Sequence, residues 1–224
     1  MTPTPESLEA LSNLRDFSNY QWYIIPILVI VLYIYATEIQ KAQQTKNWNV
    51  VFAGATVLGM DLINETWNAL VFHFTDYSAF WTTPARSTFI IMIGWNLEIA
   101  LMFSIAGIVF AKFLPEEKDK KIFGIPNRWF FAAAFAIFAV FVEVLLNVSD
   151  ALIWEYPWWN ATPWGIPLIF LFGYFHFFVA AFLIHDAREM KTKIKTVASI
   201  YAIGLVAVLI FMFIPTWIGA DPWI

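Results

Sequence analysis

Cysteine is absent from the 224-residue chain, and charged residues make up only 13% of it. Without cysteine, the chain cannot form disulfides, use a thiolate nucleophile or bind a metal or cluster through cysteine. Soluble domains carry roughly 25% charged residues, so the low charge content argues against an ordinary soluble domain. The net charge of −4 and the lack of a large basic patch argue against a nucleic-acid partner.

Apolar residues make up 60% of the sequence and are concentrated in long runs. Each run is long enough to cross about 30 Å of hydrocarbon at about 1.5 Å per residue. The sequence therefore predicts an all-α fold, a polytopic transmembrane helical bundle with about six spans. The predicted spans cover residues 20–37, 48–74, 87–113, 129–154, 165–184 and 197–217. We expect a polar N-terminal segment (1–19), one transmembrane domain (20–217) and a short C-terminal tail (218–224).

Basic residues are unevenly distributed between the two ends of the predicted bundle. Nearly all Lys and Arg residues fall in the loops after the first, third and fifth predicted spans, and the other side holds Arg15 and Arg86. By the positive-inside rule, the three basic loops are cytoplasmic and both termini lie outside, in a plasma membrane protein. The opposite loops, residues 73–86 and 155–164, are rich in aromatic residues and proline. They are typical of an interfacial aromatic belt, or they form a lid over a site below.

Two segments of the sequence resemble each other. Residues 61–70 and 143–152 share acidic and amide residues at corresponding places, and both end in Ala-Leu. The similarity predicts an internal repeat in which spans two and three correspond to spans four and five. A repeat of two spans preserves orientation, so we expect the halves to be related by an axis along the membrane normal.

Polar residues recur at helical spacing within the predicted spans. Asp61, Glu65 and Asn68 lie at i, i+4 and i+7, on one face of a helix. The fourth predicted span repeats this spacing at Glu143, Asn147 and Asp150. Because an acid facing lipid costs several kcal/mol, we expect both faces to converge on one interior volume.

The candidate residues fall into two groups. The predicted catalytic carboxyl groups are Glu65, Glu98, Glu143, Asp61 and Asp150. The predicted substrate-binding side chains are Asn64, Asn68, Asn96, Asn147, His176, Trp67, Trp95 and Tyr174. Apart from Lys112 at the end of the third span, the predicted spans hold no Lys or Arg to neutralise the acids, so some must be protonated, hydrogen-bonded or bound to a cation. The chain lacks the Glu-x-x-His pairs of di-iron bundles, and we predict no metal and no other cofactor.

Three stretches of the sequence combine aromatic residues with an acid or with a Gly-x-Pro run: Ile153-Trp154-Glu155-Tyr156, Trp164-Gly165-Ile166-Pro167-Leu168 and Trp95-Asn96-Leu97-Glu98. They resemble stretches of the small integral-membrane lycopene cyclases, carotenoid hydratases and related membrane terpene cyclases. The resemblance spans roughly residues 61–178. The Pro-Glu-Glu run of the small lycopene cyclases is absent, because Leu97 precedes Glu98. The resemblance implies acid-initiated cyclisation or hydration of an isoprenoid.

Three functions are compatible with these features. The first is a cofactor-independent membrane enzyme that acts on an isoprenoid-type substrate through a carboxylic acid. The second is a small proton- or cation-coupled transporter, since the predicted repeat would place acids symmetrically near the middle of the membrane. The third is a non-enzymatic membrane subunit or lipid-binding protein. Membrane lipids and a hydrophobic small molecule are the expected partners, and the sequence leaves the oligomeric state open.

Overall fold

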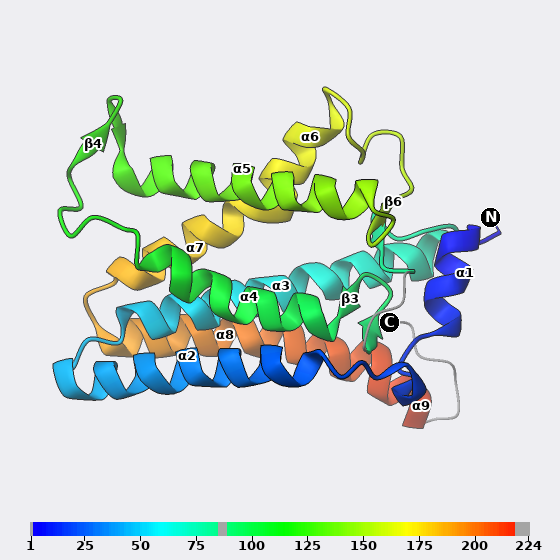
Figure 1. Ribbon diagram of the computed structural model, residues 1–224, viewed down its shortest axis with the longest axis horizontal. Helices are drawn as coiled ribbons and strands as arrows, with labels where there is room; N and C mark the ends of the chain where they lie inside the picture. Colours follow the sequence, from blue (N-terminus) through cyan, green and yellow to red (C-terminus); the bar gives the residue numbers. More distant parts are fainter. Residues whose placement is uncertain (1, 85–88, 218–224) are drawn as a thin grey trace.

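The protein forms an elongated helical bundle in a computed structural model that describes residues 2–84 and 89–217, without the side chains of residues 216 and 217 (Figure 1). Arg86, the beginning of the third predicted span and the predicted C-terminal tail lie outside these residues. The long helices run along the long axis of the molecule (Figure 1). The fold is therefore the all-α bundle that the apolar runs predict.

The elements follow one another along the chain in a simple order. The N-terminal segment contains α1 (Pro5–Ser12) and the short helix η1 (Phe17–Asn19). The helices of the bundle are α2 (Ile24–Thr45), α3 (Asn49–Thr75), α4 (Leu97–Ala111), α5 (Asn127–Val148), the continuous run of α6 (Gly165–Leu168), η2 (Ile169–Phe175) and α7 (His176–Asp186), and the run of α8 (Met190–Val208), η3 (Leu209–Phe213) and α9 (Ile214–Trp217). Short strands join them: β1 (Trp81–Thr82), β2 (Ile90–Met92), β3 (Trp95–Asn96), β4 (Lys121–Ile122), β5 (Ile125–Pro126) and β6 (Ile153–Trp154).

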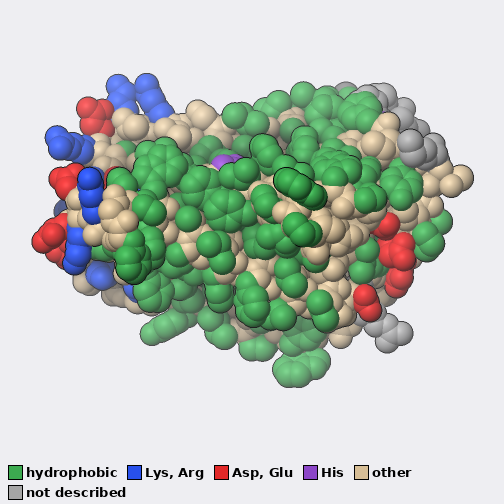
Figure 2. Space-filling view, turned by 90° about the horizontal axis from the view of Figure 1, so that it is seen from above, with side chains coloured by type: hydrophobic (Ala, Val, Ile, Leu, Met, Phe, Trp, Pro, Cys, Tyr) green, Lys and Arg blue, Asp and Glu red, His purple; other side chains and the backbone are tan. Residues whose placement is uncertain are grey.

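Four of the described helices are long and apolar enough to cross a membrane. They cover Ile24–Thr45, Asn127–Val148, Gly165–Asp186 and Met190–Phe213. The helix Leu97–Ala111 is apolar but shorter. Apolar side chains cover the middle of the surface, while Lys and Arg side chains gather at one end (Figure 2). Length, composition and this surface distribution fit an integral membrane protein.

Helices α4 and α5 are shorter than the third and fourth predicted spans, to which they correspond. The apolar run before α4 forms a hairpin of β2 and β3, and the helix begins only after Asn96, whose side chain accepts a hydrogen bond from the Ile99 N–H at 2.8 Å. An N-cap of this kind satisfies a backbone donor that the helix itself leaves unpaired. At the end of α5, Asp150 takes a left-handed conformation with φ of 57°. The helix therefore stops at Val148 instead of continuing to the predicted end of the span.

Helix α3 is the centre of the bundle and packs against α4, α7 and α8. Small residues allow this close packing, as is common where helices meet in membranes. A Cβ atom at Gly107 of α4 would lie 2.6 Å from the Ala53 carbonyl oxygen and 2.9 Å from the Gly54 Cα atom. The backbones of α3 and α4 are thus in direct contact. Helix α5 lies further out and packs against η2 and α7 (Figure 1).

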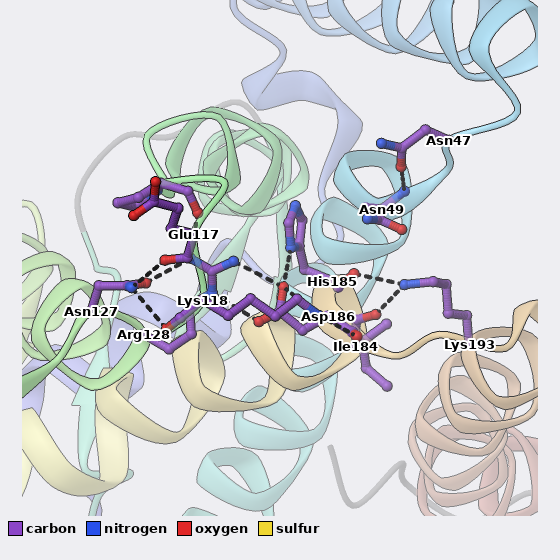
Figure 3. A network of polar contacts seen from close by, with 11 residues as sticks. Asn47, Asn49, Glu117, Lys118, Asn127, Arg128, Ile184, His185, Asp186 and Lys193 are labelled. Carbon is purple, nitrogen blue, oxygen red and sulfur yellow. Dashed lines mark hydrogen bonds and ion pairs between the residues drawn. The ribbon is translucent and has the colours of Figure 1, made fainter. Parts of the chain in front are cut away.

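A polar network ties two loops together at the end of the bundle that carries the basic residues. Arg128 at the start of α5 donates to both carboxylate oxygens of Asp186, at 2.8 and 3.0 Å (Figure 3). The His185 Nδ1 lies 2.8 Å from the same carboxylate, and Lys118 lies 3.6 Å from it. Lys193 of α8 donates to the carbonyl oxygens of Ile184 and His185. Asp186 therefore holds the loops before α5 and before α8 in one position.

The opposite end of the bundle is covered by α1 and by strands β1, β2, β3 and β6, whereas β4 and β5 lie at the basic end (Figure 1). Strand β1 pairs antiparallel with β6, so that Trp81 lies opposite Trp154. Thr4 donates to Glu155 at 2.7 Å, and Ala10 of α1 belongs to a buried apolar cluster with Ala79. The polar N-terminal segment therefore docks over the two aromatic loops.

Candidate functional site

Three buried carboxyl groups each accept a hydrogen bond from a tryptophan indole. Trp95 Nε1 donates to Asp61 at 2.8 Å. Trp81 Nε1 donates to both oxygens of Glu65, at 2.9 and 3.1 Å. Trp154 Nε1 donates to Glu143 at 2.8 Å. The exposed fractions of the three acids are only 2%, 4% and 4%. An N–H donor within this distance range satisfies one acceptor position of each buried carboxyl group.

Two helices and three loop segments bring these pairs together. Asp61 and Glu65 are one helical turn apart on α3, and Glu143 comes from α5. The tryptophans come from β1, β3 and β6, at the end of the bundle where α1 lies (Figure 1). Asn68 holds the first loop, because its amide donates to the Trp81 carbonyl at 2.8 Å and its oxygen accepts from the Phe80 N–H at 2.8 Å.

The three carboxyl groups share one small cavity. Asp61, Glu65 and Glu143 all line a space of about 40 Å³, and Glu65 lies close enough to both other acids to interact with them electrostatically. Such a volume holds a few water molecules, since a cavity needs roughly 10–15 Å³ for each water molecule. Like charges at such separations in a low dielectric repel strongly. The arrangement therefore favours a shared proton within the cluster.

A larger apolar cavity adjoins the carboxyl cavity. It has a volume of about 360 Å³ and lies between α4, α5 and the η2–α7 segment. The two cavities share Met102, Phe103, Glu143, Leu146 and Tyr174. Glu143 is the acidic residue among the described residues that line the apolar cavity. A hydrophobic molecule in this cavity would therefore be in reach of a carboxyl group.

The apolar cavity reaches the surface of the bundle. Met102 and Val109 of α4 line it and are 42% and 37% exposed, and Phe138 of α5 lines it and is 53% exposed. A molecule dissolved in the hydrocarbon of a membrane could enter the cavity sideways, between α4 and α5.

A π-helical segment shapes the wall of the site opposite α3. Helix η2 interrupts the α-helical pattern between α6 and α7, and π-helical turns are frequent at functional sites. Its Tyr174 lines both cavities, as Glu143 of α5 does. Asn64 of α3 lines the carboxyl cavity and donates to the Phe172 carbonyl of η2 at 3.1 Å. The two helices are therefore linked by a polar contact beside the acids.

The structure brings together some of the predicted site residues. Asp61, Asn64, Glu65, Glu143 and Tyr174 line the carboxyl cavity. Two more support it from outside, because Trp95 binds Asp61 and Asn68 holds the loop that carries Trp81. The predicted convergence of α3 and α5 on one volume is therefore present for Glu65 and Glu143.

Two predicted acids lie elsewhere. Glu98 is in the first turn of α4 and accepts a hydrogen bond from Tyr23 at 2.6 Å, so it faces the N-terminal part of α2 rather than the cavity. Asp150 is exposed in the turn after α5. The matching face of three residues on the fourth span does not form, because the helix ends before Asp150. Asn147 instead donates to the Leu152 carbonyl at 3.0 Å and stabilises that turn.

Three further predicted residues also have local partners outside the cavity. Asn96 caps α4, as described above. His176 Nδ1 lies 3.1 Å from the Leu171 carbonyl within its own helix. Trp67 is 43% exposed and packs on Phe80 with ring centroids 4.6 Å apart. Within the described part of the chain, no three His, Asp or Glu side chains are grouped as metal ligands.

Three aromatic residues that complete the site were not among the predicted site residues. Trp81, Trp154 and Trp159 are only 7%, 4% and 2% exposed, so all three face inward. Trp158 and Trp164 are exposed, at 46% and 83%, as an interfacial belt requires. The aromatic loops therefore have both buried and exposed tryptophans, and their roles as a lid or as an interfacial belt stay predictions. One feature of the sequence could have indicated these partners. A buried acid without a basic partner requires some other hydrogen-bond donor, such as an indole N–H.

The chain has relatives of the same length. Residues 4–213 match an uncharacterized membrane protein family. An uncharacterized protein of Archaeoglobus fulgidus is 46% identical over 217 residues, which cover 96% of this chain and 100% of the relative. No solved structure matches the chain. Neither match links the chain to isoprenoid cyclases or hydratases, so that resemblance remains a prediction. The extent of both matches shows that the chain belongs to this uncharacterized membrane protein family.

Proposed function

We propose that the protein is an integral membrane enzyme that protonates an isoprenoid-type substrate and thereby cyclises or hydrates it. The observation that carries this proposal is the position of Glu143, which lines both the carboxyl cavity and the apolar cavity. A carboxylic acid at the end of an apolar cavity can act as a general acid on a hydrophobic substrate. The neighbouring carboxyl groups can accept the proton that is released at the end of the reaction.

The proposed reaction conserves protons. The Glu143 carboxylic acid adds its proton to an alkene carbon, and the neighbouring carbon becomes a carbocation. In cyclisation, a second double bond attacks the cation, and a carboxylate in the cluster then removes a proton from an adjacent carbon. In hydration, a water molecule attacks the cation and gives its surplus proton to the same carboxylate. The proton returns to Glu143 through the cluster with Glu65.

Aromatic side chains around the two cavities suit a cationic intermediate. Phe103, Tyr174 and Phe177 line the carboxyl cavity, and Phe103 and Tyr174 also line the apolar one. The faces of aromatic rings carry negative charge density that attracts a cation within about 6 Å. The small volume beside the acids limits the number of water molecules that can reach the cation.

The membrane placement forms part of the proposal. We propose that α3 and α4 cross the membrane with the four apolar helices, which gives six spans. Helix α3 has 27 residues, a length of about 40 Å, and the surrounding helices shield its acids from lipid. By the positive-inside rule, the end with Lys118 and Arg128 faces the cytoplasm of a plasma membrane protein, with both termini outside.

An internal repeat is also part of the proposal. Glu65 accepts from Trp81 as Glu143 accepts from Trp154, and the two tryptophans are opposite each other on β1 and β6. This relation supports a repeat of spans two and three in spans four and five. It pairs Glu143 with Glu65, whereas the sequence similarity aligned it with Asp61.

Lipid analysis of an isoprenoid-producing host tests the proposed enzyme. Cells that express the wild-type chain should accumulate either an isoprenoid isomer of unchanged mass or a product heavier by one water. The variant Glu143→Gln keeps the size and the hydrogen-bonding oxygen but has no proton to give, so the new species should fall at least about a hundredfold. Asp150→Asn is the matched control, because Asp150 is exposed outside the site. An unchanged isoprenoid profile in several substrate backgrounds would refute the enzyme.

A proton-coupled transporter is the second candidate. The specific observation in its favour is that Asp61, Glu65 and Glu143 all line one cavity, which is large enough for water. In proteoliposomes, a transporter should move its solute with protons, and the double variant Asp61→Asn/Glu143→Gln should stop this flux. Solute flux that survives the double variant would remove the basis for this candidate.

A further inference from the structure

One residue that lines the carboxyl cavity carries a buried donor without a partner within the described part of the chain. Trp159 is 2% exposed and is one of the residues that line the cavity. Its Nε1 atom is buried without a hydrogen bond. Buried donors are almost always satisfied, and leaving one unsatisfied costs about 1–3 kcal/mol. The three other indoles at the site each have a carboxyl acceptor. Trp159 therefore has the capacity to bind an acceptor atom of a ligand.

The charge of the cavity restricts that acceptor. Asp61, Glu65 and Glu143 line the cavity, and the described residues that line either cavity include no Lys, Arg or His. A phosphate or carboxylate head would be repelled by the acids and would have no cation to bind. An ammonium head would suit the acids but offers no acceptor to the indole. A hydroxyl group suits both, because its oxygen accepts from Trp159 while its O–H donates to a carboxyl oxygen.

The neighbouring cavity restricts the rest of the ligand. Its lining includes Ala106, Val109, Phe110, Phe138 and Ala139. A dry cavity of about 150 Å³ accommodates benzene, so the volume of about 360 Å³ has room for roughly 14 carbon atoms, or about three isoprene units. The continuity of the two cavities through Glu143 and Tyr174 places the head and the chain of one molecule side by side.

We infer that the two cavities form one binding site for a single-chain isoprenoid alcohol, whose hydroxyl group binds between Trp159 and the carboxyl cluster, and that phosphorylated forms of the alcohol are excluded. This inference rests on the proposed function for the isoprenoid nature of the chain. It adds the head group, the residue that recognises it and the length of chain.

Binding of three probes to the wild-type protein tests the head group directly. Radiolabelled farnesol, farnesyl phosphate and farnesylamine are titrated separately into the protein in lipid nanodiscs, and binding to empty nanodiscs is subtracted. Farnesol should bind saturably, and farnesyl phosphate should bind at least about tenfold more weakly. Equal or tighter binding of farnesyl phosphate, or no saturable binding of farnesol, would overturn the inference.

Two pairs of variants test the residues. Trp159→Phe should weaken farnesol binding about fivefold, the value of one hydrogen bond, and should leave farnesylamine binding unchanged. Trp158→Phe should change neither, because Trp158 is 46% exposed and lines neither cavity. Ala139→Trp should fill the apolar cavity and abolish binding, whereas Ile137→Trp on the exposed face of α5 should not. Equal effects within either pair would contradict the assignment.

These measurements separate the binding inference from the proposed enzyme. Saturable farnesol binding that depends on Trp159, without any product formed, would leave the inference intact and refute the proposed chemistry. Conversion of a phosphorylated isoprenoid by the protein would support the chemistry and refute the inferred head group.

Discussion

The hydrogen bond between Trp154 and Glu143 should contribute measurably to the stability of the bundle. Trp154 is 4% exposed, and its indole N–H lies 2.8 Å from Glu143 Oε1. Replacing Trp154 by Phe leaves a buried acceptor without this donor, at a cost of about 1–3 kcal/mol. The smaller ring also leaves a cavity, which costs about 1–2 kcal/mol more. The expected loss in the free energy of unfolding is therefore about 2–5 kcal/mol.

A double-mutant cycle separates the two contributions. The free energy of unfolding is measured by circular dichroism in mixed micelles at increasing SDS, for Trp154→Phe, Glu143→Met and the double variant. In the Glu143→Met background no acceptor remains, so Trp154→Phe should cost only the packing part, about 1–2 kcal/mol. The coupling energy should be about 1–3 kcal/mol. Trp164→Phe is the control, since Trp164 is 83% exposed. A coupling energy near zero, or an equal cost for both tryptophan variants, would refute the structural role of the indole–carboxyl pair.

Three further predictions concern the helix packing, the N-terminal segment and the topology. Gly107→Val should lower the free energy of unfolding by about 3 kcal/mol, because the side chain would collide with the α3 backbone. Gly173→Ala is the control and should be tolerated in the same denaturation assay, because the nearest atom to its Cβ would be 3.6 Å away. Partial burial raises the pKa of the Glu155 carboxyl group above its ordinary value of 4.5. The protonated side chain should therefore stabilise docking of the N-terminal helix fully below pH 4.5. This stabilisation should be lost as the pH rises through the folded-state pKa. Hydrogen exchange in this helix, corrected for the intrinsic rate, should therefore accelerate on raising the pH, and Glu155→Gln should remove the change. Since the chain has no cysteine, Lys120→Cys and Trp158→Cys give single labels, and in intact cells only the second should react with an impermeant maleimide; the opposite pattern would reverse the proposed orientation.

Helical spacing and the cost of burying charge were enough to predict the centre of the site. Asp61 and Glu65 are one turn apart, so they had to share a face of α3. With Glu143 on another apolar run, a common interior volume was the arrangement that removed all three acids from lipid. The structure places these three acids around one cavity.

The boundaries of the helices could not be predicted in the same way. Apolar character continues through residues 89–93 and 151–154, but short strands form there because Asn96 caps α4 and Asp150 adopts a left-handed turn. Hydropathy does not distinguish a buried strand from the end of a membrane helix. Glu98 and Asp150 were therefore assigned to the site, although one faces Tyr23 and the other is exposed.

The tryptophan partners were missed for a related reason. Tryptophans near the ends of predicted spans are usually assigned to the membrane interface. Trp81 and Trp154 instead lie opposite each other on paired strands and turn their indole nitrogens toward Glu65 and Glu143. This pairing joins residues that are far apart in the sequence, so no local pattern indicates it. The π-helical turn that carries Tyr174 is likewise a consequence of the folded bundle.

Transfer of a solvent-derived proton to carbon tests the central claim most directly. The purified protein is reconstituted in liposomes containing the isoprenoid substrate identified by lipid analysis and is assayed in D₂O, and the product is analysed by mass spectrometry. If the carboxyl cluster starts the reaction, the wild-type product should carry deuterium bound to carbon at the protonated position, and Glu143→Gln should form no such product while Asp150→Asn does. A product formed by the wild-type protein without deuterium on carbon, or equal labelling with Glu143→Gln, would contradict acid initiation at this site.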